Sequence, residues 1–242
     1  MNLSPAFTYP SELATVLRQQ GYAVLSPEGL CELAGCSLAE LDVLRAGWDD
    51  LPPDEYLKDG GRYRRRRHSC FVAEEGSLVQ VPHRAHWQPV EYNALHGGME
   101  RWFEPMKPDD VAAPAWKRLI AALGQVSSGL KGKQPWYVEA HQFRIDTTDG
   151  IGRPTPEGAH RDGVDFVAVL LVGRTDIKGG ETRVFEAQGT HGQRFTMTAP
   201  WTLLLLDDER VIHESTPIQP LAEGAHRDTL VLTYRAGGFQ GA

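Results

Sequence analysis

The sequence predicts a mainly β domain, a sandwich or barrel, with α-helices in its N-terminal half. The chain has 242 residues of which 41% are apolar, which is enough to bury one core without help from a disulfide or a metal. Helical signals dominate before residue 135, and short strand-like runs follow it. We therefore expect a single domain over 1–242, with helical support and lid segments in 1–134 and the β core in 135–236.

The helical signals come in order along the N-terminal half. A segment from Ser11 has apolar residues at helical spacing and stops at Gly21, after which a short strand follows. Ser37 and Glu40 form a capping box that starts a second helix. The clearest helix begins at Pro114. Its apolar stripe comprises Trp116, Leu119, Ile120, Leu123 and Val126.

Seven short runs rich in β-branched and aromatic residues follow residue 135, and Gly, Pro or Asp separates most of them. Their spacing is typical of a jelly-roll or cupin-like arrangement. The runs are WYVEAHQFRI, DFVAVLLVG, ETRVFE, QRFTMT, WTLLLLDD, VIHESTPI and TLVLTYRA.

Charge and cysteine content indicate the compartment and the partners. A net charge of −7 disfavours nucleic acid and anionic membranes as partners. The three cysteines suit a reducing cytoplasm, and the Cys31 and Cys36 pair lacks the further ligands of a zinc finger. We expect no signal peptide and no membrane span. The oligomeric state is left open.

Three side chains have the residue types of a metal site. His160 and Asp162 stand two residues apart before an apolar run, and His213 lies in a later strand that a rolled sheet brings alongside. Two imidazoles and one carboxylate form the facial triad of non-heme Fe(II) oxygenases, which leaves positions open for a chelating co-substrate and O₂. The alternative is a surface His160 and a core His213 bonded to a backbone carbonyl.

Arg227 and Thr229 share one face of the last strand. A guanidinium on the inner wall of a barrel binds a carboxylate in bidentate fashion, and the threonine hydroxyl adds a hydrogen bond. The alternative is an arginine in water on an edge strand.

At these residues the sequence resembles the Fe(II)/2-oxoglutarate-dependent dioxygenases, over roughly residues 135–235. The segments HRDGVDFV, GGETRVF and IHESTPI resemble, more narrowly, the bacterial subfamily that includes L-isoleucine 4-hydroxylase. Thr229 stands where many relatives have serine, and it keeps the hydroxyl. The resemblance implies a double-stranded β-helix, Fe(II), 2-oxoglutarate and O₂. It also implies that Arg227 binds the 5-carboxylate of 2-oxoglutarate.

The resemblance further implies hydroxylation of a small free L-amino acid with release of succinate and CO₂. Two alternatives remain: the same chemistry on a protein or nucleic-acid residue, and a cupin-like metal-binding module without oxidase activity. A buried carboxylate anchor at Arg227 disfavours the second, because a plain cupin has no need of one.

Substrate contacts are the least constrained prediction. In the basic run Arg62 to His68, alternation places Arg64 and Arg66 on one face, where they can bind a carboxylate together. The same run fits a nucleic-acid patch or a solvated charge cluster. Gln142 and Arg144 share one face of their strand, Glu139 and His141 share the other, and the sequence does not say which face lines the barrel. Possible ammonium partners are Glu139, Asp165 and Glu181. A metal pair at His83 and His86 is a weaker possibility.

Overall fold

The computed structural model describes residues 3–241. Its helices are α1 (Leu13–Gln20), α2 (Pro27–Ala34), α3 (Leu38–Asp42), α4 (Pro108–Ala112) and α5 (Pro114–Lys131), with 3-10 turns at Pro10–Glu12 and Val43–Trp48. Its strands are β1 (Tyr22–Leu25), β2 (Arg64–Glu74), β3 (Ser77–Gln80), β4 (Trp136–Asp146), β5 (Phe166–Thr175), β6 (Ile177–Gly179), β7 (Thr182–Glu186), β8 (Gly192–Phe195), β9 (Leu203–Asp207), β10 (Val211–Ser215), β11 (Ile218–Pro220) and β12 (His226–Arg235).

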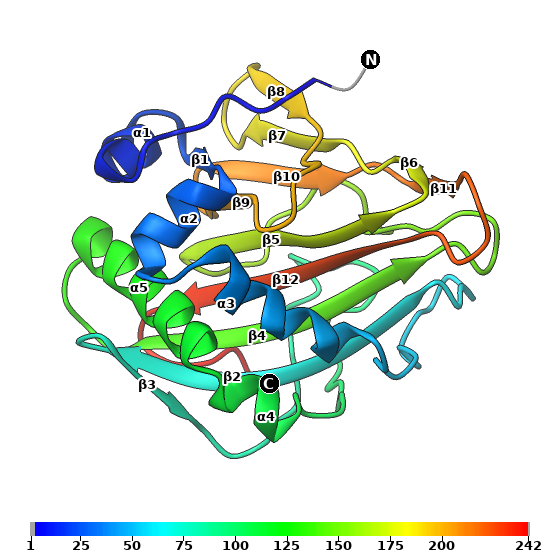
Figure 1. Cartoon of the computed structure of the whole chain (residues 1–242), viewed down its shortest axis with the longest axis horizontal. Helices are drawn as coiled ribbons and strands as arrows, with labels where there is room; N and C mark the ends of the chain where they lie inside the picture. The colour runs from blue at the N-terminus through cyan, green and yellow to red at the C-terminus, as the bar shows by residue number, and fades with distance from the viewer. Residues whose placement is uncertain (1–2, 242) are drawn as a thin grey trace.

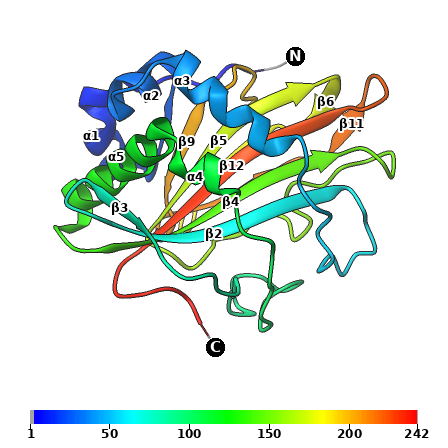
Figure 2. The ribbon, with the colours of Figure 1, turned by 60° about the horizontal axis from the view of Figure 1, so that its bottom comes forward.

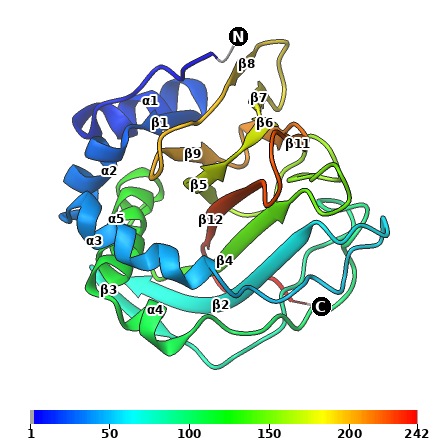
Figure 3. The ribbon, with the colours of Figure 1, turned by 45° about the vertical axis from the view of Figure 1, so that its right-hand side comes forward.

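One large antiparallel sheet and two small ones make up the β structure. The large sheet has the order β1-β9-β5-β12-β4-β2-β3, and the small sheets are β10-β7-β8 and β11-β6. Helices α2, α3 and α5 lie across one face of the large sheet (Figure 1). Figure 3 shows β12 between β5 and β4, at the centre of that sheet. The prediction of a mainly β fold supported by N-terminal helices is confirmed.

The main core lies between the helices and the large sheet. The α5 side chains Trp116, Leu119 and Ile120 are fully buried there, as the predicted stripe requires. The Tyr234 hydroxyl of β12 donates to the Ile120 carbonyl at 2.9 Å and ties the helix to the sheet. Figure 2 shows α5 along this face. The alternate side chains of the same strands point to the other face of the sheet.

The capping signals in the N-terminal half are also present. The Ser37 hydroxyl accepts from the Glu40 backbone, and the Glu40 carboxylate accepts from the Ser37 backbone at 2.8 Å. Gly21 ends α1 in the left-handed conformation, with φ of 79°. These local rules depend only on neighbouring residues, which is why the sequence contains them.

The sheet begins earlier in the chain than predicted. β2 lies within the segment assigned to helical support and lid, yet it pairs with β4 along ten residues, for example Arg66 with Phe143. The basic run lacks the apolar alternation that marks a strand, because its inward face lines a polar cavity instead of a core. Arg64 and Arg66 point inward and are buried, whereas Arg62 and Arg65 are more exposed. The run is therefore not one exposed basic patch.

No helix among residues 3–241 is both long and apolar enough to cross a bilayer.

Candidate active site

Two loop residues and one strand residue bring three potential metal ligands together. His160 and Asp162 lie in the loop before β5, outside the strand itself, and His213 lies in β10. His160 and His213 exchange two backbone hydrogen bonds, of 3.1 and 3.0 Å, which places their imidazole rings 4.8 Å apart. Asp162 is 4.0 Å from the Nε2 atom of each histidine. The three ligand atoms therefore converge on one point.

The Asp208 carboxylate shapes the loop that carries Asp162. It accepts hydrogen bonds from the backbone N–H groups of Asp162, Gly163 and Val164, at 2.8 to 3.1 Å. Gly163 has φ of 75°, and a Cβ there would stand 2.4 Å from the Tyr92 ring. Only glycine fits this turn without strain. Asp208 thus fixes the direction in which Asp162 points.

The hydrogen bonds and the burial of these side chains suit a divalent cation. The Nδ1 atom of His160 donates to the Gly158 carbonyl at 2.9 Å, so the lone pair of Nε2 faces Asp162. Burial lowers the pKa of His213 well below its ordinary value, and His160 adds to this effect. A neutral imidazole is the form that binds a metal. Burial acts to lower the pKa of His160, but the neighbouring Asp162 and Glu157 carboxylates raise it overall. Two imidazoles and a carboxylate on one side of a point fit Fe(II) with open positions.

Arg227 and Thr229 face the same cavity from β12. Both are 3% exposed. No carboxylate among residues 3–241 lies within ion-pair distance of Arg227, and its buried Nη2 atom has no hydrogen-bond partner. Burial, and then the nearby Arg174, lower the pKa of Arg227 to about 10. A buried guanidinium without a counter-ion is costly, so this position is suited to an anionic ligand.

One cavity of about 120 Å³ connects these groups. Residues from β4, β5 and β12 form one wall and residues from β10 form another, so the small sheet faces the large one across it. Its charged lining comprises Arg64, Arg66, Arg101, Glu157, Asp162 and Arg227. The cavity combines apolar side chains with a few convergent polar ones, as small-molecule sites do.

Three predicted substrate contacts do not line this cavity. Gln142 donates to Asp110 at 3.2 Å on the helix side of the sheet. Arg144 forms a bidentate pair with Asp228, at 2.8 and 2.7 Å. Asp165 binds Lys131 at 2.8 Å. The opposite face of β4 lines the cavity instead, because the alternate face packs on the helices.

Arg64 and Arg66 do line the cavity, and each has a counter-ion. Arg64 donates to Asp54 at 2.7 Å, and Arg66 lies 3.7 Å from the same carboxylate. The Arg66 guanidinium stacks between Phe103 and Phe143, with 3.8 and 4.4 Å to the ring centroids. This sandwich holds Arg66 rigidly at the cavity wall.

Several polar cavity residues were not predicted as site residues from the sequence. Gln88, Asn93 and Arg101 lie in the long connection between β3 and α4, and Glu157 lies in the loop before His160. These segments have no helical or strand period that would predict where a side chain points. The signals available were the position of Glu157, three residues before His160, and a weaker extension of the family resemblance over residues 92–106, which contain Asn93 and Arg101.

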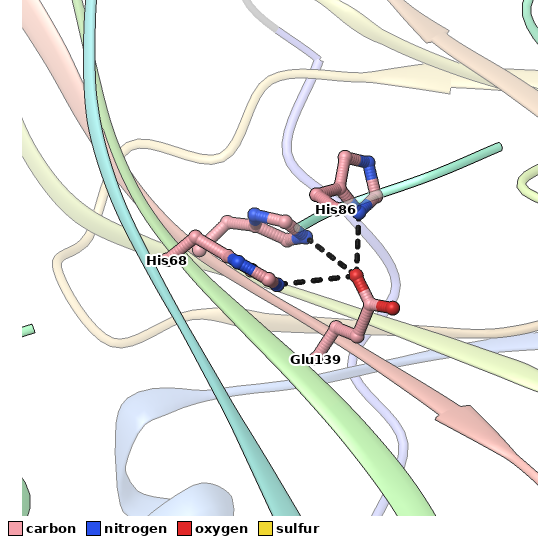
Figure 4. Close-up of side chains that lie close together, drawn as sticks. His68, His86 and Glu139 are labelled. Carbon is pink, nitrogen blue, oxygen red and sulfur yellow. Dashed lines mark hydrogen bonds and ion pairs between the residues drawn. The ribbon is translucent and has the colours of Figure 1, made fainter. Parts of the chain in front are cut away.

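Figure 4 shows a second cluster of His and Glu side chains. Two of its members, His86 and His141, also line the cavity. One oxygen of Glu139 lies 3.1 Å from Nε2 of His68 and 2.5 Å from Nδ1 of His86. Nε2 of His141 is 3.9 Å from Glu139. All four side chains are buried.

The geometry of this cluster is that of a hydrogen-bonded network and not of a metal site. Arg66 donates to Nδ1 of His141 at 2.6 Å, so the proton of that neutral imidazole is on Nε2, which then has no lone pair for a metal. His83 is not part of the cluster, and its ring packs on Trp102.

Known proteins share sequence and fold with this chain. The family model described as 2OG-Fe dioxygenase matches residues 45–233. A crystal structure of a bsmA homolog from Methylobium petroleophilum PM1 is 55% identical, with a TM-score of 0.93, and the match covers 98% of this chain and 97% of that one. No curated protein matches.

Two more distant structures show the same fold. IDO from Bacillus thuringiensis is 16% identical, with a TM-score of 0.76 and coverage of 96% of this chain and 100% of that one. The Fe(II)/(alpha)ketoglutarate-dependent dioxygenase TqaL is 18% identical, with a TM-score of 0.70 and coverage of 96% and 90%. The fold is the double-stranded β-helix, and the family implies Fe(II), 2-oxoglutarate and O₂. The chain belongs to the 2OG-Fe dioxygenase family.

Proposed function

We propose that this enzyme hydroxylates a small free L-amino acid and releases succinate and CO₂. His160, Asp162 and His213 are the iron ligands in this proposal, and Arg227 with Thr229 binds the 5-carboxylate of 2-oxoglutarate. The observation that carries it is the shared cavity, which holds both the convergent ligand atoms and a buried arginine without a counter-ion.

The residues of the chain supply position, charge and exclusion of water. Iron with 2-oxoglutarate and O₂ supplies the oxidising power when bound, and three protein ligands on one side leave the remaining positions to these co-substrates. Arg227 neutralises the distal carboxylate, and Thr229 donates a further hydrogen bond. Val169 and Val231 make part of the wall apolar, which limits the water that reaches the reacting carbon.

The cavity favours a small charged substrate over a bulky apolar one. Buried charged side chains line it beyond the iron ligands. Arg64 and Arg66 are proposed to add to the positive potential around the substrate carboxylate. The proposal includes a cytoplasmic location, because Cys31, Cys36 and Cys70 are free thiols and a reducing compartment keeps thiols free.

A screen of the twenty L-amino acids tests the proposal. The purified enzyme with Fe(II), ascorbate and 2-oxoglutarate is assayed for succinate above the substrate-free background. At least one amino acid is expected to stimulate turnover, and its carboxylate ester is expected not to. Asp162→Ala serves as the blank. Stimulation by a peptide or an oligonucleotide, with none from any amino acid, would assign the same chemistry to a macromolecular substrate. If no condition gives 2-oxoglutarate turnover, the remaining interpretation is a metal-binding module without oxidase activity.

A further inference from the structure

Glu157 is a buried carboxylate of the cavity that lacks a counter-ion of its own. Its side chain is 12% exposed, and its Oε2 atom has no hydrogen-bond partner. Its Oε1 atom lies 3.5 Å from Nε2 of His160. In the proposed site that nitrogen binds iron and carries no proton, so it cannot donate to Glu157. The carboxylate therefore faces the cavity next to the metal position and needs a cationic donor.

Arg101 is the matching buried cation. It is 2% exposed, its Nε atom has no hydrogen-bond partner, and its Nη2 atom donates to the neutral Gln88 amide at 2.9 Å. No carboxylate among residues 3–241 lies within 4.0 Å of it. Burial, and then Arg64, lower the pKa of Arg101 to about 10. An anion beside Arg101 would offset the cost of burying its charge.

The remaining charges of the cavity wall already have partners. Arg64 and Arg66 share Asp54. Arg227 is assigned to the distal carboxylate of 2-oxoglutarate, and Asp162 is assigned to iron. One carboxylate and one guanidinium are left, and they do not form an ion pair with each other. A molecule that carries both a cation and an anion can satisfy both of them.

We propose that Glu157 binds the α-ammonium group of the substrate and that Arg101 binds its α-carboxylate. This assignment rests on the proposed function, because it identifies how the same cavity recognises a free amino acid. It replaces the ammonium partners considered from sequence, of which Asp165 is paired with Lys131 outside the cavity. Recognition of both the α-ammonium and the α-carboxylate group also predicts that a peptide is excluded, since its internal residues lack both charges.

Binding of matched ligands tests the ammonium site and the carboxylate site separately. The anaerobic enzyme with Fe(II) and 2-oxoglutarate is titrated calorimetrically with three compounds. These are the best amino acid of the screen, its analogue with hydrogen in place of the ammonium group, and its analogue with hydrogen in place of the carboxylate. Wild-type enzyme is expected to bind the amino acid at least tens-fold more tightly than either analogue, because each analogue leaves one buried charge unpaired.

Variants then test whether Glu157 binds the ammonium group and whether Arg101 binds the carboxylate. In Glu157→Gln the preference for the ammonium group is expected to fall to about threefold or less, while the preference for the carboxylate stays. In Arg101→Gln the preference for the carboxylate is expected to fall, while the preference for the ammonium group stays. Arg101→Lys is expected to restore part of the carboxylate preference. Glu223→Gln, an exposed substitution, is the control and keeps both preferences. Iron content and 2-oxoglutarate affinity are measured on every variant.

The outcomes separate this inference from the proposed function. If wild-type enzyme binds no amino acid, the proposed function fails. If it binds one with a strong ammonium preference that survives in Glu157→Gln, the assignment of Glu157 is wrong and the proposed function stands. Glu157→Gln keeps the size and shape of the side chain, so this arm remains decisive even if the substitutions at the fully buried Arg101 prevent folding.

Discussion

Gln88 donates a hydrogen bond from Nε2 to Oδ1 of Asp162 at 3.1 Å. Its Oε1 atom accepts from Arg101 at 2.9 Å and from Asn93 at 3.0 Å, which fixes the orientation of the amide. One neutral side chain therefore connects a proposed iron ligand with the proposed carboxylate site. Partners of this kind orient a ligand and tune its affinity for the metal.

Gln88→Leu is expected to weaken Fe(II) binding by roughly 10- to 100-fold, because Asp162 loses the donor that orients it. Equilibrium titration of the anaerobic apoprotein with Fe(II) measures the effect. Gln20→Leu, at an exposed position, is the control. Unchanged iron affinity in Gln88→Leu would show that Asp208 and the backbone are sufficient to orient Asp162.

Alanine at His160, Asp162 or His213 is expected to abolish 2-oxoglutarate turnover and to remove iron after dialysis. Each substitution takes away one of three ligands, while the helix-packed core on the far side of the sheet is untouched. Metal analysis and succinate formation are the measurements, and circular dichroism checks the fold. Normal turnover with full iron occupancy in His213→Ala would contradict the ligand assignment. A chelator is expected to inactivate the wild-type enzyme, and Fe(II) is expected to restore it.

Arg227→Leu is expected to raise the KM for 2-oxoglutarate at least tens-fold, since losing one partner of a buried charge pair costs about 2–5 kcal/mol. The KM of Arg227→Lys is expected to lie between those of the wild type and Arg227→Leu, because an ammonium group cannot form a bidentate fork. Thr229→Val removes one neutral hydrogen bond and is expected to raise KM about three- to tenfold. Succinate formation at varied 2-oxoglutarate concentration measures all three, with Arg62→Leu as an exposed control. An unchanged KM in Arg227→Leu would place the anchor elsewhere, with the neighbouring Arg174 the first candidate.

The buried histidine network makes stability depend on pH in a defined direction. Burial lowers the pKa of His86 to about 3, although Glu139 acts to raise it, whereas an unfolded histidine titrates near 6.5. Between these values the unfolded chain binds a proton that the folded chain does not, so the free energy of unfolding falls as pH decreases from 6.5 toward 3. Urea unfolding from pH 7 to pH 4 measures the slope.

His86→Gln is expected to flatten that slope, whatever its effect on stability at neutral pH. His191→Gln is the control, because the side chain of His191 is 85% exposed, and it is expected to keep the wild-type slope. A wild-type slope in His86→Gln would assign the acid sensitivity to other groups, with His68 and His141 the next to test.

The sequence by itself determined the strands after residue 135, the α5 stripe, the capping box at Ser37 and the residue types of the metal site. Each of these is encoded locally, by a period of two or 3.6 residues or by a short motif. The bridge between His160 and His213 confirms that the two segments meet. The two residues pair through their backbones, as expected for strands that a rolled sheet brings side by side.

Only the tertiary structure decided which side chains face the cavity. Alternation along β4 separates Gln142 from His141, but packing of the helices on one side determined that His141 faces inward. The strand character of β2 was hidden because its inward residues are arginines, which become stable there through Asp54 and two phenylalanine rings from distant segments. Arg101 and Glu157 lie in loops without a period, so their approach to the metal position depends on long-range packing that no local pattern contains.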